Sequence, residues 1–133
     1  MGNQQFDRRT FPPPTGRTLH LVPEPLWRLT GQGDFYQPEG FEDEGFIHTT
    51  HDPQVLVEVA NRNYRDDPRP YLVLEIELAR VAEPVRYDDT LCQYPHVYGP
   101  LNTSSIVAVR RINRREDGTF FEISEDGSVG RES

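Results

Sequence analysis

The sequence contains no lysine, so all 14 of its basic residues are arginines. A chain without lysine cannot form a Schiff base with a carbonyl substrate, and it cannot build a Walker A phosphate loop. Arginine remains available as a planar fork that binds carboxylates and phosphates through paired hydrogen bonds. We therefore expect any anionic ligand of this protein to be bound by arginine.

Cysteine is almost absent as well. The single residue, Cys92, cannot form an internal disulfide or supply a metal site made of several cysteines. One hypothesis makes Cys92 a nucleophile with His96 as its base, but four residues in a proline-containing loop do not fix that geometry. The alternative interpretation is a packed, unreactive thiol. The sequence also lacks a Gly-x-Ser-x-Gly elbow and a Gly-x-Gly-x-x-Gly segment after a strand, so serine acyl transfer and Rossmann chemistry have no support.

Positive charge and long apolar runs are missing too. The 22 acidic residues outnumber the basic ones and give a net charge of −8, so no broad basic face is available to release counter-ions from DNA. No run approaches the roughly 20 apolar residues of a membrane span, and the N-terminus has no signal-peptide pattern. We expect neither DNA nor a membrane as partner, and a cytoplasmic location.

The length of 133 residues suits one domain with a single core, and the 12 prolines and 10 glycines predict many loops. Residues 1–16 are rich in proline and predict a flexible N-terminal arm. Residues 17–124 form the predicted domain, and residues 125–133 form an acidic C-terminal tail.

Local patterns predict mostly β-structure. A helix is expected from the N-cap Asp52 and the following Pro53 to about residue 64 or 65, and a shorter helical stretch over residues 24–29. Residues 34–44 read as a loop with an extended piece at 35–36. Alternating or β-branched runs predict strands over residues 18–22, 45–50, 71–78, 85–87, 105–112 and 119–123. Five or six strands with one main helix indicate an α+β domain with a mostly antiparallel sheet.

The four histidines lie in strands or at the junctions of strands, loops and the helix. His20 lies within a strand, His48 at a strand end, His51 before the helix cap, and His96 in the loop of residues 94–102. Histidine is the side chain whose ordinary pKa lies nearest neutrality, so it serves as acid, base or ligand. We expect three of them, His20, His48 and His96, to share one ligand pocket, with His48 and His96 as its catalytic residues.

Two kinds of ligand fit this pattern. The first is an anionic or nucleotide-like molecule, bound at the helix start and by Arg62. Its further candidate contacts are neutral or aromatic side chains, namely Thr49, Asn61, Tyr98 and Asn102. The second is a metal ion held by His48, His51 and His96, although the first two straddle a strand end and a helix start and do not form a helical His-x-x-x-His pair.

Four segments together resemble a known family, the bacterial domain-of-unknown-function family 952. They are residues 19–23 with Trp27, residues 44–50, residues 59–64 and residues 94–102. The resemblance spans about residues 18–112. It implies a compact relative of the ADP-ribosyltransferase superfamily, in which a small split sheet forms a cleft for NAD. By position, His20 would be the first-strand residue that contacts the ribose or phosphate, residues 45–50 the second-strand wall, and residues 96–102 the third side.

The sequence departs from that superfamily at one point. Many of its transferases carry a catalytic glutamate on a late strand, where this chain has His96, Val97 and Tyr98. Relatives similar to the RNA 2′-phosphotransferase use histidines and lack the glutamate. The resemblance thus implies a cleft that binds NAD, ADP-ribose or a similar phosphorylated nucleotide, in a transferase or a phosphate-processing enzyme, with NAD as candidate cofactor. The alternatives are a non-catalytic ligand-sensing or protein-interaction module and a histidine-ligated, metal-dependent hydrolase.

Overall fold

The structure is a computed structural model, and it describes residues 12–125. Most of the predicted N-terminal arm and all but the first residue of the predicted C-terminal tail lie outside the described residues. The first strand of the described residues begins at Arg17.

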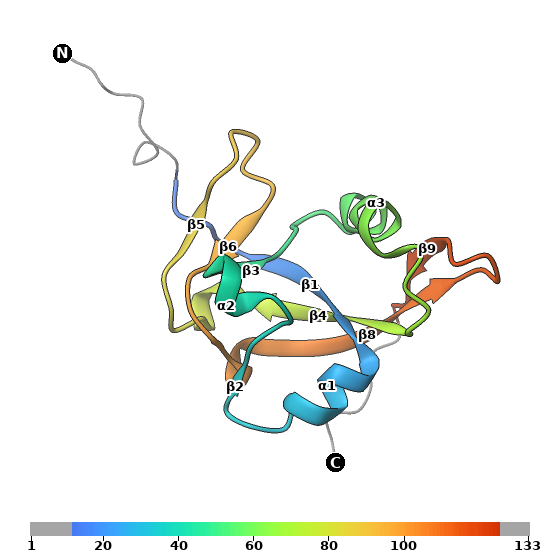
Figure 1. The fold of residues 1–133 in the computed structure, drawn as a ribbon. Coiled ribbons are helices and arrows are strands. Elements are labelled where there is room, and N and C mark those ends of the chain that lie inside the picture. Colours follow the sequence, from blue (N-terminus) through green and yellow to red (C-terminus); the bar gives the residue numbers. More distant parts are fainter. Residues whose placement is uncertain (1–11, 126–133) are drawn as a thin grey trace.

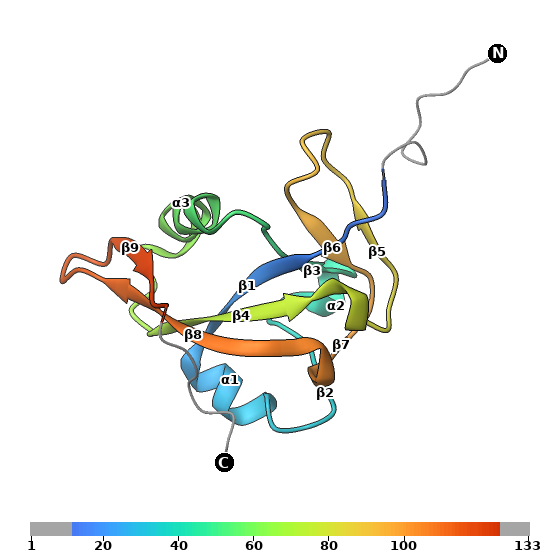
Figure 2. The same cartoon turned by 180° about the vertical axis from the view of Figure 1, so that it is seen from behind.

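The main sheet has four antiparallel strands in the order β1-β4-β8-β9, which Figures 1 and 2 show from opposite sides. They span Arg17–Pro23, Tyr71–Glu77, Ile106–Arg114 and Phe120–Ile123. The central strand β4 is buried on both faces, because Leu72, Leu74 and Ile76 enter one hydrophobic cluster while Tyr71 and Val73 enter another. Side chains alternate between the faces of a strand, so β4 separates two halves of the core.

Helices cover both faces of this sheet. Helix α3 (Pro53–Tyr64) packs Leu56 and Ala60 into the cluster that contains Tyr71 and Phe120. The N-cap Asp52 accepts a hydrogen bond from the Gln54 amide at 2.8 Å, which confirms the predicted helix start. Helix α1 (Glu24–Thr30) lies on the opposite side of the sheet and buries Trp27 in the other cluster (Figure 1).

Two smaller antiparallel sheets complete the fold. Strands β3 (Ile47–His48), β6 (Pro95–Val97) and β5 (Val85–Tyr87) form one sheet, and β2 (Phe35–Tyr36) pairs with β7 (Leu101–Asn102) in the other. A single bridge joins the outer edge of β1 to the segment after β3, where Leu19 and Thr50 exchange two hydrogen bonds of 2.9 Å. The chain is therefore α+β, with mostly antiparallel strands divided among separate sheets.

Several short elements differ from the prediction. The described residues contain nine strand segments where five or six were expected. The additional strands are β2, β6 and β7, which have two or three residues each and are too short for alternation to be visible. The strand predicted over residues 45–50 is limited to Ile47–His48. The predicted loop of residues 34–44 contains a one-turn helix, α2 (Phe41–Glu44), set between Gly40 and Gly45, which both have φ above +80°. Two 3₁₀ turns, Leu78–Arg80 and Thr103–Ser105, precede β5 and β8.

Between residues 12 and 125, every helix is too short or too polar to cross a bilayer.

Candidate functional site

A cavity of about 900 Å³ lies beside the outer edge of β1. Most of its wall comes from β1, the segment around α2, helix α3, and the β3–β6 sheet, and β2 and β4 contribute Tyr36 and Tyr71. The lining includes His20, Leu21, Tyr36, Glu39, Asp43, Glu44, His48, Thr49, Arg62, Tyr64, Tyr71 and His96. The cavity thus lies between the main sheet and the three-stranded sheet, which are joined by the bridge from Leu19 to Thr50.

The structure brings His20, His48 and His96 together at this cavity. His48 and His96 are register partners of β3 and β6, and their ring centroids are 5.1 Å apart. The Nδ1 atom of His20 lies 2.7 Å from the His48 carbonyl oxygen. Three histidines separated by up to 76 positions therefore meet because β3 lies between β1 and β6.

His20 is a buried, neutral member of the set. A carbonyl can only accept, so Nδ1 of His20 carries the proton and donates to His48. Nε2 is then the acceptor, and the Tyr36 hydroxyl donates to it at 2.8 Å. Burial lowers the pKa of His20 to about 4, against the opposing hydrogen bond to the His48 carbonyl. His20 therefore holds the cavity in shape at neutral pH and does not act there as an acid.

His48 lies at the exposed end of the cavity. Its Nε2 atom is 3.0 Å from a carboxylate oxygen of Glu44, which lies four positions earlier at the end of α2. A carboxylate accepts, so Nε2 of a neutral His48 carries the proton and Nδ1 keeps its lone pair. The ring of Phe46 packs edge-on against His48, at a centroid distance of 4.8 Å.

His96 has a different partner. Its Nδ1 atom lies 2.9 Å from Asp88, which also accepts hydrogen bonds from the Tyr98 hydroxyl and, through its other oxygen, from Arg86 at 3.1 Å. Burial opposes ionisation of Asp88, but these three donors outweigh it and lower the pKa of Asp88 to about 2. Phe46 stacks on His96 at 4.2 Å. The His96 imidazole is thus held at both its edge and its face.

Sequence reasoning missed Asp88. It stands eight positions before His96, directly after β5, and no local pattern marks it. The antiparallel pairing that places Arg86 opposite His96 brings the carboxylate to the imidazole. The contact between His96 and Asp88 depends on how β5 and β6 pair, so it can be recognised only when their register is known.

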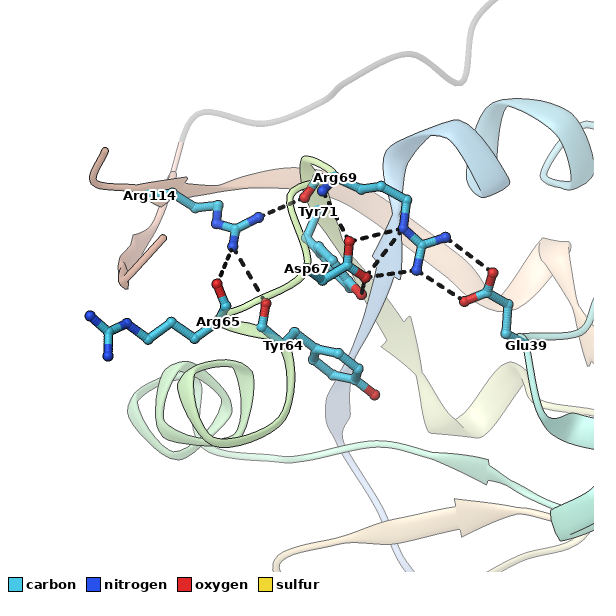
Figure 3. A network of polar contacts seen from close by, with 7 residues as sticks. All are labelled: Glu39, Tyr64, Arg65, Asp67, Arg69, Tyr71 and Arg114. Atoms are coloured by element: carbon cyan, nitrogen blue, oxygen red, sulfur yellow. Dashed lines mark hydrogen bonds and ion pairs between the residues drawn. The ribbon is translucent and has the colours of Figure 1, made fainter. Parts of the chain in front are cut away.

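Tyrosines form another part of the cavity wall, and the sequence reasoning missed them too. The rings of Tyr64 and Tyr71 stack at 5.1 Å, and Tyr71 donates its hydroxyl proton to Asp67 at 2.7 Å. Arg69 joins Asp67 to Glu39, which ties the loop after α3 to the segment before α2 (Figure 3). The bonds from Arg69 hold the pKa of Asp67 well below its usual range. Tyr71 covers one face of the Tyr64 ring, and Tyr64 lines the cavity with 36% of the residue surface exposed, which leaves the ring accessible to a ligand.

The other predicted site residues divide into two groups. Arg62 and Thr49 line the cavity. The Thr49 hydroxyl donates a hydrogen bond to the Pro95 carbonyl at 2.6 Å. Within residues 12–125, no hydrogen bond or ion pair involves the Arg62 side chain. Asn61, Tyr98 and Asn102 do not line it. Asn61 exchanges two hydrogen bonds with the Phe120 backbone, Asn102 bonds to the backbone of Arg80 and Ala82, and the Tyr98 ring is covered by the Arg86 guanidinium at 4.3 Å.

The fold does not bring together His48, His51 and His96, the three imidazoles of the predicted metal site. Both nitrogens of His51 are engaged elsewhere, by the Arg17 carbonyl and the Tyr87 hydroxyl, each at 2.8 Å, and His51 lines a separate cavity of about 390 Å³. Over the described range, no three His, Cys, Asp or Glu side chains lie close enough to hold a metal ion. The hypothesis failed because the two residues between His48 and His51 lead the chain away from the β3–β6 sheet, and Thr50 pairs with Leu19 of β1.

The sulfur of Cys92 is not part of the cavity wall. Cys92 is half-buried in the β5–β6 loop, and its φ of 53° places it in the left-handed region. His96 directs Nδ1 to Asp88, so the predicted pairing of His96 with Cys92 has no support in the geometry.

Comparison with known proteins agrees with this fold. No curated protein matches the chain. The crystal structure of protein CC0527 from Caulobacter crescentus is similar, with a TM-score of 0.66, 20% identity, and coverage of 79% of this chain and 93% of that one. A double mutant of CC0527 gives a TM-score of 0.65 with the same identity and coverage. These two likenesses concern the fold alone. The model of the family described as "Protein of unknown function (DUF952)" matches residues 21–109, and the chain therefore belongs to the DUF952 family.

Proposed function

We propose that the cavity beside β1 binds NAD or the closely related ADP-ribose. The observation that carries this proposal is the meeting of three histidines, Arg62 and an open tyrosine ring at one cavity of about 900 Å³. A volume of this size accommodates a ligand of several hundred daltons. The split arrangement of the sheets agrees with the resemblance to ADP-ribosyltransferases, whose cleft lies between two such sheets.

The outer edge of β1 supplies one argument for a ligand with a carboxamide. Leu19 uses its N–H and C=O on Thr50, so both groups point away from β4. Peptide groups alternate in direction along an antiparallel strand, so the N–H and C=O of Leu21 point outward as well, and Leu21 lines the cavity. A donor and an acceptor on one residue match the NH₂ and C=O of a primary amide such as that of nicotinamide.

Charge and aromatic surface supply a second argument. Arg62 is the only arginine among the described residues that line the cavity, and its guanidinium is available for a diphosphate. The carboxylates of Asp43 and Glu44 face the same cavity and suit a cationic ring, and the open face of Tyr64 suits a planar one. NAD combines a diphosphate with a planar, positively charged nicotinamide ring. One lining arginine can neutralise part of a diphosphate, but the several phosphates of an RNA end would require more basic residues.

His96 is the side chain best placed for acid–base work in this proposal. Asp88 occupies Nδ1 and leaves Nε2 as the atom available to a ligand hydroxyl or a water molecule. The enzyme class that fits is therefore an ADP-ribose-transferring or NAD-hydrolysing enzyme without the glutamate of its relatives. A sensor that binds the same ligand without turnover would have the same cavity and would release no nicotinamide.

The proposal is tested by isothermal titration of the purified protein with NAD and ADP-ribose, combined with an assay for released nicotinamide. Substitutions His48→Ala and His96→Ala are expected to weaken binding by at least about tenfold, the effect of losing one good hydrogen bond to a ligand. His51→Ala is the matched control, because His51 lines the other cavity, and should bind as the unaltered protein does. Absence of binding by the unaltered protein, or equal binding by all three variants, would refute the proposal.

A further inference from the structure

Asp88 accepts hydrogen bonds from three side chains, which lie on or next to the paired strands β5 and β6. Arg86 belongs to β5, His96 belongs to β6, and Tyr98 follows β6. Arg86 also covers the Tyr98 ring, so it holds the third donor in place. A carboxylate with three donors has one stable orientation, and that orientation places an acceptor at Nδ1 of His96.

Two carboxylates, Asp88 and Glu44, set opposite tautomers in the neighbouring histidines of the cavity. Asp88 accepts from Nδ1 of His96, whereas Glu44 accepts from Nε2 of His48. A neutral imidazole carries one proton, so the lone pair is on Nε2 in His96 and on Nδ1 in His48. The two environments differ in rigidity as well, because the side chain of His96 is 15% exposed and that of His48 is 59% exposed.

We infer that Asp88 is the positioning residue of this site, holding His96 in the Nδ1–H tautomer so that Nε2 accepts a proton or hydrogen bond from a hydroxyl group of the bound ligand. The role of the ligand rests on the proposed function, whereas the tautomer depends on the geometry alone. Phe46, stacked on His96 at an interplanar angle of 20°, prevents the ring from tilting out of line. The hydroxyl that suits Nε2 is a ribose hydroxyl of NAD or ADP-ribose, since the neutral hydroxyl groups of these ligands are on ribose.

This assignment explains why the predicted ligand contact Tyr98 lies outside the cavity wall. Its hydroxyl proton is donated to Asp88 and its ring is covered, so both of its functional surfaces are used within the protein. Tyr98 supports Asp88, and Asp88 orients His96.

The experiment is a two-bond ¹H–¹⁵N correlation spectrum of the histidine rings, recorded about two pH units above the ordinary histidine pKa so that the imidazoles are neutral. The unaltered protein should show His96 protonated on Nδ1 and His48 on Nε2. In Asp88→Ala, His96 should shift toward the Nε2–H form that free histidine prefers, while His48 stays unchanged and serves as the internal control. Tyr98→Phe removes one donor from Asp88 but leaves the bond to His96, so the Nδ1–H form should persist.

Titration with NAD completes the test. Asp88→Ala should lower the affinity for NAD by about tenfold, the loss expected for one ligand hydrogen bond, and the circular dichroism spectrum should stay that of the folded protein. His96 that keeps its Nδ1 proton in Asp88→Ala, or an Nε2–H form in the unaltered protein, overturns the assignment of Asp88. Failure of the unaltered protein to bind NAD overturns the proposed function and the ligand contact, and the tautomers still decide the positioning role separately.

Discussion

The hydroxyl of Tyr36 donates its proton to Nε2 of His20 over 2.8 Å, and the direction of this bond is set by the backbone. The His48 carbonyl accepts a hydrogen bond from the protonated Nδ1 of His20, so Nε2 carries a lone pair and no proton. Tyr36 has 1% and His20 has 6% of its surface exposed, so water cannot replace either bond easily. Burial also raises the pKa of Tyr36, which keeps the phenol protonated as this arrangement requires.

Replacing Tyr36 with Phe should therefore destabilise the protein. The substitution removes the only donor to Nε2 of His20 among the described residues and leaves a buried acceptor unsatisfied, which costs about 1–3 kcal/mol in the free energy of unfolding. Urea unfolding followed by Trp27 fluorescence measures the change. Tyr64→Phe is the matched control, because its side chain is partly exposed, and it should change stability by less than about 0.5 kcal/mol. Equal effects of the two substitutions would contradict the assigned bond.

The stability of the protein should fall as the pH is lowered from 7 toward 4. The pKa of His20 is about 4 in the folded protein and has its ordinary value of 6.5 in the unfolded chain, so the unfolded state binds the proton more readily. The stabilisation is complete above pH 6.5 and is lost as the pH falls below that value. Between pH 7 and pH 5 the free energy of unfolding should decrease by about 2 kcal/mol.

Urea unfolding at a series of pH values measures this dependence. In His20→Gln the slope between pH 6.5 and 5 should largely disappear, because glutamine does not titrate. The carboxyls of Asp88 and Glu75, whose pKa values are also lowered, add their effect at more acidic pH, below the ordinary carboxyl range. An unchanged slope in His20→Gln would show that another group is responsible.

Tyr64 should contribute to ligand affinity through its open ring face. Tyr71 covers the other face at 5.1 Å, and Arg114 donates to the carbonyls of Tyr64 and Arg65 at the end of α3 (Figure 3). Tyr64→Ala should weaken NAD binding by about tenfold, since stacking on an aromatic ring contributes about 1–3 kcal/mol. Titration calorimetry measures the affinity.

Two variants make that measurement specific. Tyr64→Phe keeps the ring and should bind NAD as the unaltered protein does. Phe121→Ala removes another exposed aromatic ring, on β9 and outside the cavity wall, and should leave affinity unchanged. NAD affinity that survives Tyr64→Ala would exclude Tyr64 as a ligand contact.

Gly118 should tolerate no side chain. Its φ is +95°, and a Cβ atom would come within 2.6 Å of the Arg65 carbonyl oxygen at the end of α3. Gly118→Ala should cost about 1–3 kcal/mol, the penalty of a strained backbone position. Thermal unfolding measures the loss, and Gly33→Ala is the control because a Cβ there meets open space and should change stability by less than about 0.5 kcal/mol.

The long periodic elements of this protein could be predicted from residues alone. Strands β4 and β8 and helix α3 appear where alternation, β-branched runs and the N-cap Asp52 placed them, since each of these signals acts within a few residues. The choice of His20, His48 and His96 as residues of one cavity was also made from the sequence. The family match over residues 21–109 agrees with the four sequence segments that carry the resemblance to this family.

The partners of those histidines were decided by tertiary structure. Tyr36 lies 16 positions from His20, and Asp88 lies eight positions from His96 across a hairpin. His48 and His51 are three positions apart, yet they line different cavities, because the bridge from Leu19 to Thr50 lies between them. A sequence pattern specifies which residues are present and their local conformation, but strand pairing determines which side chains meet. Tautomers, pKa values and metal sites depend on contacts between distant residues, and so they were settled only by the fold.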